Sequence, residues 1–395
     1  MKRLALLGLG LALALDLAAC GDRPAGSPRD GARSVAGILS STGGSSAKDS
    51  GFARAIAPRT FVFPADHGPH PEFRTEWWYV TGNLATAEGR GFGFQWTVFR
   101  NALAPETPRR DSRWGSRDVY LGHFALSDLE GRSFLPFERF RRGALGLAGA
   151  YAAPFRVALD DWTLESEGDA TWPAHLVAGE GKGAERAAID LVLDEGIPPV
   201  LQGDRGLSKK GPAPGNASYY YSLPRMPARG EIRLGSRIFK VAGLAWLDRE
   251  WSTDGLAPGL VGWDWFALQL DDGHELMLYR LRRRDGTAAP ESRGTLILPG
   301  GTTRPVEWRD LAFDEIAAWT SPKTGARYPA AWRLRIPGER LDLTVRPRLA
   351  DQELDGDFRY WEGAVAVAGT RAGRPVGGSG YVELTGYADA AAPPR

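Results

Sequence analysis

Short runs of alternating apolar and polar residues, separated by glycine-containing turns, recur along most of this chain of 395 residues. Such alternation indicates β-strands with one buried face, because successive side chains of a strand point to opposite sides. Turn signals such as Glu88-Gly89 and Asp271-Asp272-Gly273 separate neighbouring runs. No segment shows a sustained helical period, although residues 313–319 fit either a short helix or a strand. The sequence therefore predicts an all-β protein.

Two predicted hairpins resemble each other and suggest an internal duplication. Residues 76–96 and residues 263–279 each place an acid beside paired aromatic residues, followed by a strand, a tight turn and a second strand. Their spacing is close to half of the folded length, which suits two units of the size of a single antiparallel barrel. Closure into a barrel removes the exposed edges of a sheet and encloses a volume. We expect one barrel over residues 60–225 and another over residues 226–395.

The N-terminus carries a targeting signal. Basic residues at Met1-Lys2-Arg3 precede an apolar run that ends in Leu17-Ala18-Ala19-Cys20, which has the form of a bacterial lipobox. We predict a lipoprotein signal peptide over residues 1–20, acylation at Cys20 and a flexible linker over residues 21–59. The predicted location is the cell envelope, at the periplasmic face of the outer membrane. An ordinary secretory signal with an incidental cysteine is the alternative.

Composition excludes several classes of function. The formal net charge is +1, which gives no electrostatic case for a nucleic-acid partner. A Walker A loop, a dinucleotide fingerprint and a GxSxG motif are all missing from the sequence, and we predict no cofactor. The 14 tryptophans exceed what a packed core requires and favour a lined cavity for a hydrophobic small molecule.

Candidate catalytic residues concentrate in the segment FPADHGPHPEFRTEWWYVTGNL, residues 63–84. Asp66, His67, His70 and Glu76 fit an acid–base cluster, a metal site or a rigid loop that covers a barrel end. We assign no metal ligand, because no HExxH or equivalent motif is present. His123 is a further catalytic candidate, which we expect mid-strand and pointing into an apolar barrel, where it would be a neutral base. The alternative is a histidine whose ring bonds a neighbouring group.

Aromatic residues supply the candidate ligand-binding set. Strand alternation places Trp77 and Tyr79 on one face and Trp78 on the other, so that one face lines a cavity. Asp248, Arg249 and Glu250 are expected to form a charge network at a barrel rim. The predicted ligand-binding residues are Trp77, Trp78, Tyr79, Trp96, Trp251, Trp265 and Tyr279.

Four separated motifs resemble those of one known family. They lie at residues 63–84, 121–128, 243–251 and 380–387, and occur in the order found in the AttH-like and carotenoid 1,2-hydratase-like family of predicted secreted hydrolases. The resemblance covers the chain from Phe61 onward and implies two consecutive lipocalin-like antiparallel β-barrels. Relatives include carotenoid hydratases, which add water to a terminal isoprenoid double bond, and fungal cyclases that fold a polyene in a pocket between the barrels.

Two residues depart from the hydratase pattern. Arg249 stands where the hydratases carry a histidine, and Leu281 stands where they carry an aspartate. Because hydration of an unactivated alkene needs a strong general acid, these departures argue against carotenoid hydration itself.

The sequence therefore predicts a lipid-anchored envelope protein that binds an isoprenoid, polyene or lipid. Hydration, isomerisation and cyclisation are the candidate reactions. One alternative is a metal-dependent secreted hydrolase that uses His67, His70 and either Glu76 or Asp66. Another alternative is a non-enzymatic lipoprotein whose partners are components of an envelope transporter.

Overall fold

The computed structural model describes residues 51–106 and 112–388, almost all of whose regular structure is antiparallel strand. The described helical segments are short 3-10 turns: η1(Ala65–His67), η2(Gly183–Glu185), η3(Trp308–Asp310) and η4(Pro337–Glu339). Over the described ranges, none of the helices has the length and apolar character needed to span a membrane. The predicted signal peptide with Cys20, and residues 21–50 of the predicted linker, lie outside the described residues.

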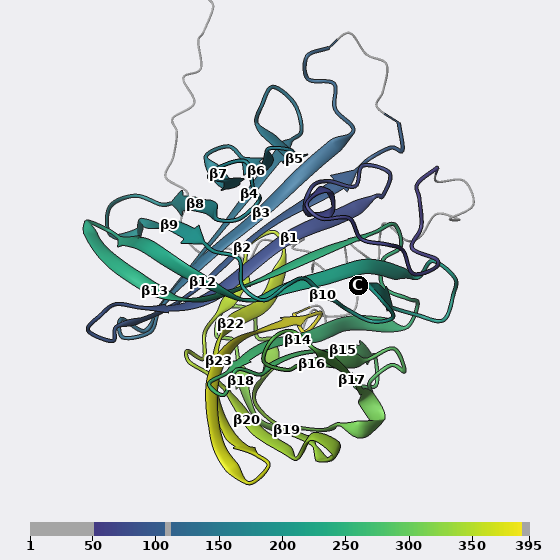
Figure 1. Cartoon of the computed structure of the whole chain (residues 1–395). Helices are drawn as coiled ribbons and strands as arrows, with labels where there is room; N and C mark the ends of the chain where they lie inside the picture. The colour runs from purple at the N-terminus through teal and green to yellow at the C-terminus, as the bar shows by residue number, and fades with distance from the viewer. Residues whose placement is uncertain (1–50, 107–111, 389–395) are drawn as a thin grey trace, which may run out of the picture. The chain divides into compact units, whose positions relative to one another are not determined.

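A sheet of 13 strands forms the first half of the fold, in the order β4-β3-β2-β1-β13-β12-β9-β8-β7-β6-β5, with β10 and β11 paired to β12 (Figure 1). Its strands are β1(Thr75–Ala85), β2(Gly91–Ala102), β3(Asp118–Asp128), β4(Ser133–Arg142), β5(Ala148–Ala152), β6(Phe155–Leu159), β7(Trp162–Ser166), β8(Ala174–Glu180), β9(Ala187–Leu193), β10(Val200–Leu201), β11(Leu207–Lys209), β12(Ala217–Leu234) and β13(Arg237–Ser252).

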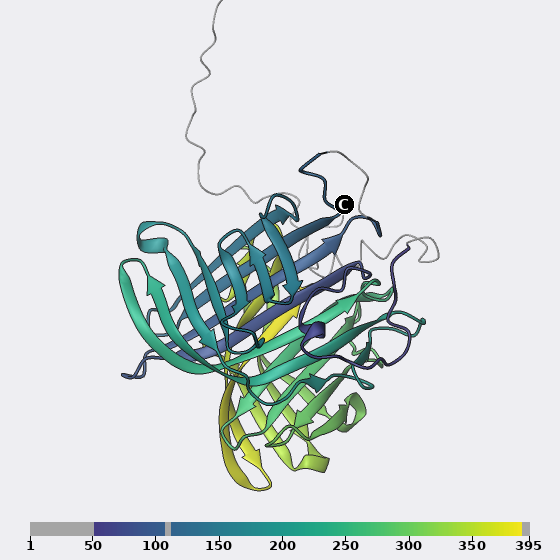
Figure 2. The ribbon, with the colours of Figure 1, turned by 45° about the horizontal axis from the view of Figure 1, so that its top comes forward.

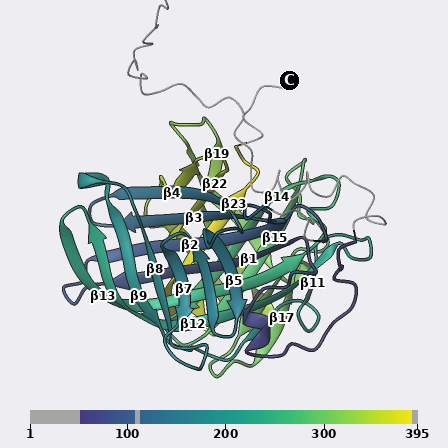
Figure 3. The ribbon, with the colours of Figure 1, turned by 90° about the horizontal axis from the view of Figure 1, so that it is seen from above.

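This first sheet curls so that its two edges meet. Figures 2 and 3 show β5–β9 folding over β1–β4. The Arg139 guanidinium of β4 donates to Glu180 of β8 at 2.8 Å, and lies over the Trp162 ring of β7. Gly122 of β3 faces Leu159 and Trp162 so closely that a Cβ would lie 2.3 Å from a Leu159 methyl group. Side chains rather than ladder hydrogen bonds therefore close this barrel-like half.

A sheet of 10 strands forms the second half, in the order β17-β16-β15-β14-β23-β22-β20-β19-β18, with β21 paired to β22. Its strands are β14(Leu260–Leu270), β15(Glu275–Arg283), β16(Arg293–Ile297), β17(Thr303–Glu307), β18(Ala312–Thr320), β19(Arg327–Ile336), β20(Leu341–Pro347), β21(Glu353–Asp355), β22(Arg359–Arg371) and β23(Arg374–Thr385). Residues 313–319, which fitted a helix or a strand, lie in β18.

The prediction of an all-β fold with two barrel-like antiparallel halves is confirmed. Both duplicated hairpins are present, because β1 pairs with β2 and β14 pairs with β15, each across a tight turn. Both sheets belong to the same unit of the chain, Ala32–Arg395.

The boundary between the halves differs from the predicted one. Residue 225 lies inside β12, and both β12 and β13 belong to the first sheet, because β13 pairs with β1 on one side and with β12 on the other. The chain passes to the second sheet only after Ser252. The sequence placed the boundary by halving the folded length, whereas non-local pairing of β13 with β1 places it later.

The predicted linker also ends earlier than residue 59. Ala53 donates its amide to the Glu72 carbonyl at 2.9 Å, and the side chain of Ala55 is fully buried. Arg54 forms an ion pair with Asp254. Residues 51–59 therefore pack on the first sheet.

Separate apolar clusters fill the two curled sheets. The first contains Trp78, Trp96, Trp162 and Trp251, and the second is built around residues such as Trp332. A third cluster joins side chains of both sheets, and contains Tyr79, Tyr220, Trp246, Trp265, Tyr279 and Tyr381.

Candidate functional site

The third cluster surrounds a pocket between the two sheets, and strand alternation supplies its first wall. Trp77 and Tyr79 of β1 lie on the face that meets the second sheet, whereas Trp78 points into the first core. Trp77 lies opposite Glu250 of β13, and Tyr79 lies opposite Asp248. Because directly opposed residues share a face of the sheet, both carboxyl groups come to the same side as the two aromatic residues.

A register row of the second sheet forms the opposite wall. Glu362 of β22 pairs with Glu383 of β23, which pairs with Trp265 of β14, which pairs with Tyr279 of β15. Four neighbouring strands thus place two carboxyl groups and two aromatic rings in one line on the face toward the first sheet.

The pocket encloses about 90 Å³, which is room for several water molecules or a small part of a ligand. Its aromatic lining comes from both sheets: Trp77, Tyr79, Phe99, Trp263, Trp265 and Tyr279. Its polar lining includes Lys210, Ser218, Tyr220, Asp248, Glu250 and Glu383. An apolar wall with a few convergent polar groups is typical of small-molecule sites.

Asp248 is a buried carboxyl group held by three donors. The hydroxyls of Tyr220 and Ser222 donate to it at 2.5 and 2.6 Å, and the Trp246 indole N–H donates at 2.7 Å. Burial raises the pKa of Asp248 to about 7, which outweighs the opposing effect of these hydrogen bonds. The Trp265 indole N–H donates in turn to the Tyr220 hydroxyl at 3.0 Å, which connects this carboxyl group to the second sheet.

Glu383 is the second carboxyl group of the pocket wall. The Trp263 indole N–H donates to it at 3.0 Å. Burial raises the pKa of Glu383 to about 7, and the nearby Glu250 and Asp248 carboxylates add to the rise. Two carboxyl groups that titrate near neutral pH therefore face one aromatic pocket, so that one is able to hold a proton while the other is ionised.

Glu362 lies beside Glu383 and is also kept neutral. It is 1% exposed, and the hydroxyls of Tyr79 and Tyr360 lie beside its carboxyl group. Burial raises the pKa of Glu362 well above its ordinary value, and the neighbouring Glu383 contributes to the rise. The buried Tyr79 hydroxyl lies next to it, and its interaction with the Glu362 carboxyl group opposes the rise. Glu362 and Tyr79 thus interact with each other at this edge of the site.

Lys210 brings a positive charge to the pocket wall. Its ammonium lies 3.0 Å from a Glu250 oxygen and 4.5 Å from the centroid of the Tyr279 ring. Burial alone would lower the pKa of Lys210, but the attraction of Glu250 outweighs it and the pKa is raised. The lysine therefore stays charged and is placed to attract an oxygen atom of a ligand.

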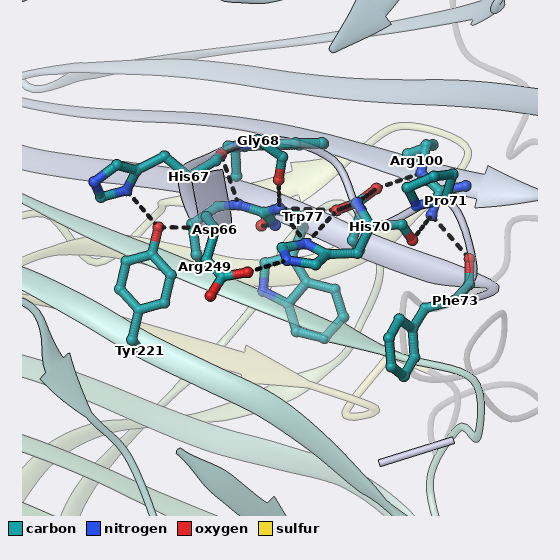
Figure 4. Close-up of polar contacts among 12 residues, drawn as sticks. Asp66, His67, Gly68, His70, Pro71, Phe73, Trp77, Arg100, Tyr221 and Arg249 are labelled. Atoms are coloured by element: carbon teal, nitrogen blue, oxygen red, sulfur yellow. Dashed lines mark hydrogen bonds and ion pairs between the residues drawn. The ribbon is translucent and has the colours of Figure 1, made fainter. Parts of the chain in front are cut away.

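Residues 63–76, which we call the opening segment, form a different structure: a hydrogen-bonded cover over one end of the first sheet (Figure 4). Glu76 is fully buried and forms ion pairs with Arg100 and, at 2.8 Å, with Arg249. Its carboxylate also accepts the His70 amide at 3.0 Å, and the His70 ring lies 3.0 Å from Asp66. Burial would raise the pKa of Glu76, but the two guanidinium groups lower it far below its ordinary range.

His67 is equally well partnered within this cover. Its Nδ1 lies 2.6 Å from the Tyr221 hydroxyl, and its carbonyl accepts the Trp78 indole N–H at 2.9 Å. Burial, aided by the Arg249 charge, lowers the pKa of His67 to about 4, so the ring is neutral at physiological pH. Within the described residues, His, Cys, Asp and Glu side chains form no group of three or more that would hold a metal ion. This geometry supports the rigid-loop interpretation of Asp66, His67, His70 and Glu76.

His123 does not point into the first barrel as expected. Its Nδ1 lies 2.8 Å from the Tyr360 hydroxyl of the second sheet, and its Nε2 lies 3.2 Å from Glu138 of the neighbouring strand β4. The apolar neighbours Phe124 and Leu126 occupy the barrel side of β3 instead. The expectation failed because the sequence shows that side chains alternate between two faces of the strand but does not reveal which face is interior.

The seven predicted aromatic residues divide into two groups. Trp77, Tyr79, Trp265 and Tyr279 line the pocket. Trp78, Trp96 and Trp251 are fully buried in the core of the first sheet, away from the pocket.

The three residues expected to form one charge network, residues 248–250, lie on two different faces of β13. Asp248 and Glu250 line the pocket, whereas Arg249 points to the opposite face and binds Glu76. Sequence reasoning missed Tyr220 and Glu383 altogether. Their signal was present in the alternation of β12 and in the last family-like motif, but the face of each strand was unknown.

Comparison with known proteins identifies the family. The AttH-like family model matches residues 54–387, which is most of the chain. The chain belongs to the AttH-like family. A crystal structure of a protein described as AttH, from Nitrosomonas europaea, superposes with a TM-score of 0.74 at 36% identity, covering 84% of this chain and 99% of that one.

Two further proteins that are similar to this AttH-like chain are named for an activity. Kievitone hydratase from Nectria haematococca shares the fold at a TM-score of 0.64 and 17% identity, over 86% of this chain and 96% of that one. A protein named dehydratase asqC, from Emericella nidulans, is 26% identical over 245 residues, which are 54% of this chain and 67% of that protein. Asp248 and Glu383 both lie inside the range matched by the AttH-like model.

Proposed function

We propose that this AttH-like protein binds an apolar small molecule in the pocket between its two sheets and adds water to it or removes water from it. The observation that carries the proposal is the pair Asp248 and Glu383, two carboxyl groups in one aromatic pocket whose pKa values are raised to about 7. The named activities of kievitone hydratase and of dehydratase asqC support the same class of reaction.

Addition of water breaks one carbon–carbon π bond and one O–H bond, and forms one C–H and one C–O bond. A protonated carboxyl group would deliver the proton to carbon while the ionised one removes a proton from water, and elimination reverses both steps. The raised pKa values allow both forms to coexist near neutral pH. Lys210 is placed to bind a ligand oxygen at the same wall.

Of the two departures from the hydratase pattern, Leu281 faces this pocket, whereas Arg249 points to the opposite face of β13. Leu281 lines the same pocket, so the position where the hydratases carry an aspartate faces the proposed ligand. Tyr220, Ser222 and Trp246 hold the Asp248 carboxyl group in place. An acid on β13 thus takes over from the absent acid on β15.

Ligand binding and chemistry are tested separately. The first measurement is binding of a panel of polyenes, fatty acids and isoprenoids, followed by tryptophan fluorescence quenching; no binding at micromolar concentration would contradict the proposal. Compounds that bind are then incubated in isotopically labelled water and analysed by mass spectrometry for gain or loss of one water.

Matched variants distinguish an enzyme from a carrier. Asp248→Asn and Glu383→Gln keep the size of each side chain and remove its acid–base function, so turnover should fall by roughly 10²–10⁴-fold while binding remains. Glu138→Gln, in a half-buried side chain outside the pocket lining, is the control and should retain turnover. A chain that binds ligand but shows no water exchange would be a carrier.

We further propose that acylated Cys20 anchors the protein in the cell envelope, at the periplasmic face of the outer membrane. Mass spectrometry of the protein from its host would detect the lipid on Cys20, and an unmodified cysteine would contradict the anchor. Co-purification with envelope transporter components would instead favour the accessory-lipoprotein alternative. Stoichiometric metal in the purified protein would revive the hydrolase alternative, for which the opening segment offers no open ligand set.

A further inference from the structure

Several large apolar side chains are exposed on the described surface. Several are about half or more exposed, among them Leu103 at 64%, Ile56 at 63%, Val62 at 57% and Trp114 at 56%. Single exposed apolar residues are ordinary, but a contiguous group usually marks a contact surface. The question is therefore where these side chains lie.

Strand pairing places most of them at one end of the first sheet. At this end β1 begins, β2 ends, β3 begins and β4 ends, because Thr75 pairs with Asn101, and Val119 pairs with both Asn101 and Arg142. The segments that continue from these strand ends carry the exposed residues. We call this set the strand-end face: Ile56, Val62, Phe63, Leu103, Trp114 and Leu145.

Backbone contacts tie these segments together. Leu103 donates its amide to the Arg117 carbonyl at 2.7 Å, and Ala102 donates to the Arg74 carbonyl at 2.7 Å. Gly143, just before Leu145, donates to the Asp118 carbonyl at 2.9 Å. The connections that carry Leu103, Trp114 and Leu145 are thus neighbours. The Tyr219 hydroxyl near the start of β12 donates to the Ala57 carbonyl at 2.9 Å, which places the segment of Ile56 at the same end of the sheet.

The rim of the pocket lies at the same end. Pocket-lining Asp254 and Leu256 belong to the connection that follows the end of β13, and Ser252 pairs with Thr75 at the start of β1. Arg54 forms an ion pair with Asp254, which joins the segment preceding Ile56 to the rim. A ligand that reaches the strand-end face is therefore beside the residues that line this end of the pocket.

The described chain also begins at this end. Gly51 lies against Pro105, since a Cβ on Gly51 would be 2.9 Å from the Pro105 ring. The predicted acylation site, Cys20, precedes Gly51 by only 31 residues. Because 31 residues span at most about 100 Å, a lipid on that cysteine would hold the protein within that distance of a bilayer, with this end of the first sheet as the point of attachment.

The chemistry of the face favours lipid as the partner. Trp114 is an indole, the side chain type that is enriched at membrane–water interfaces. Arg113 and Arg142 are exposed next to the apolar residues, and exposed cations of this kind attract anionic head groups. Apolar side chains flanked by arginine are typical of surfaces that rest in the head-group region.

We propose that the strand-end face rests on a lipid bilayer and that apolar ligands pass from the bilayer directly into the pocket beside it. The passage of ligand rests on the proposed function, whereas contact with the bilayer does not.

Site-specific labelling tests this proposal in the full acylated chain. Cys20 is the only cysteine, so after its acylation an introduced cysteine is the single free thiol. Leu103→Cys and Trp114→Cys place an environment-sensitive fluorophore on the strand-end face. Ile238→Cys and Ile316→Cys are matched controls, because these side chains are 48% and 46% exposed and lie at the opposite end of β13 and on the second sheet.

The labelled proteins are reconstituted in vesicles of phosphatidylethanolamine and phosphatidylglycerol and titrated with aqueous iodide. We expect the fluorophores at positions 103 and 114 to shift to the blue and to be quenched severalfold less than those at 238 and 316. Equal quenching at all four positions would overturn the proposal. Shielding in whole cells without shielding in vesicles would assign the face to a protein partner and would also overturn it.

A ligand measurement in the same vesicles separates the two proposals. Shielding at positions 103 and 114 without binding of any apolar ligand would contradict the proposed function and leave bilayer contact established. Binding of an apolar ligand with fully quenched labels at positions 103 and 114 would contradict bilayer contact and leave the proposed ligand binding established.

Discussion

At the scale of residues, two buried carboxyl groups differ in their protonation because their hydrogen-bond partners differ in charge. Glu76 is buried with two guanidinium groups and stays ionised, whereas Asp248 is buried with neutral donors and holds its proton up to a pKa of about 7. Because neutral donors offset desolvation only in part, an acid of the Asp248 kind is suited to proton transfer, and one of the Glu76 kind to structure.

Asp248→Asn should change how stability depends on pH. The pKa of Asp248 rises from 3.8 to about 7 on folding, so between these values the folded state holds a proton that the unfolded state releases. The wild type therefore loses stability relative to the variant as pH rises from about 5 to about 7, by at most about 1.4 kcal/mol per pH unit. Urea unfolding of both proteins across this range measures the difference. A difference that stays constant, or that grows in favour of the wild type, would contradict the raised pKa.

Glu76→Gln should destabilise the protein strongly. The substitution leaves the buried Arg100 and Arg249 without their carboxylate, which typically costs roughly 3–5 kcal/mol in the free energy of unfolding. Asp314→Asn is the control, since its ion pair with Arg335 is about half exposed and should contribute less than about 1 kcal/mol. Chemical denaturation compares the two. Similar small losses would mean that the opening segment is not a structural cover.

At the scale of elements, one strand serves two environments. Alternate residues of β1 face the pocket and the first core, and β13 behaves in the same way. This arrangement makes neighbouring tryptophans unequal, although they look alike in the sequence.

Trp77→Ala and Trp78→Ala should therefore affect different properties. Trp78 is fully buried with the Arg249 guanidinium 4.0 Å from its ring, so truncation should cost roughly 3–5 kcal/mol of stability. Trp77 is half-buried in the pocket wall, so truncation should weaken ligand binding with a smaller loss of stability. Calorimetric titration with the best ligand of the panel, together with urea unfolding, measures both. The reverse pattern would place the ligand inside the first sheet.

The sequence was sufficient to predict the elements but not their partners. Alternation and turn residues located most strands, and the paired aromatic residues located the hairpins of β1 with β2 and of β14 with β15. The pairing of β1 with β13 joins residues that are far apart in the chain, and no local pattern encodes it. For the same reason Asp248 and Tyr79 could not be placed side by side, although both residues were noted.

Which face of a strand is interior was equally hidden. A shift of one residue in register exchanges the two faces, so His123 was expected in the first barrel and lies against the second sheet. Burial of charged residues such as Arg249 on the core side made the pattern harder to interpret, because both faces of β1 and β13 carry charged and aromatic side chains.

At the scale of the whole molecule, the pocket belongs to neither sheet alone. Polar contacts cross between the two sheets, including Trp265 to Tyr220 at 3.0 Å and Ser127 to Gln352 at 2.8 Å. The enclosed space of about 90 Å³ thus depends on how the two sheets meet.

The two sheets should unfold together. They share a buried cluster and several buried hydrogen bonds, among them that of Gln269 with the Ala245 carbonyl at 3.0 Å. Unfolding of either sheet would expose these groups to water and would therefore destabilise the other sheet. We expect coincident urea transitions by tryptophan fluorescence and by far-ultraviolet circular dichroism. Two separated transitions would show that the sheets are independent.

The alternation within β13 has a practical consequence for engineering. Even-numbered positions from Trp246 to Ser252 border the junction of the sheets, whereas Arg249 and Trp251 on the odd-numbered side hold the cover of the barrel in place. A library that keeps Asp248 and varies the other even positions would explore new substrates without disturbing the core side of the strand. Randomising consecutive positions would instead mix altered specificity with misfolding, and most of its members would be lost for reasons unrelated to chemistry.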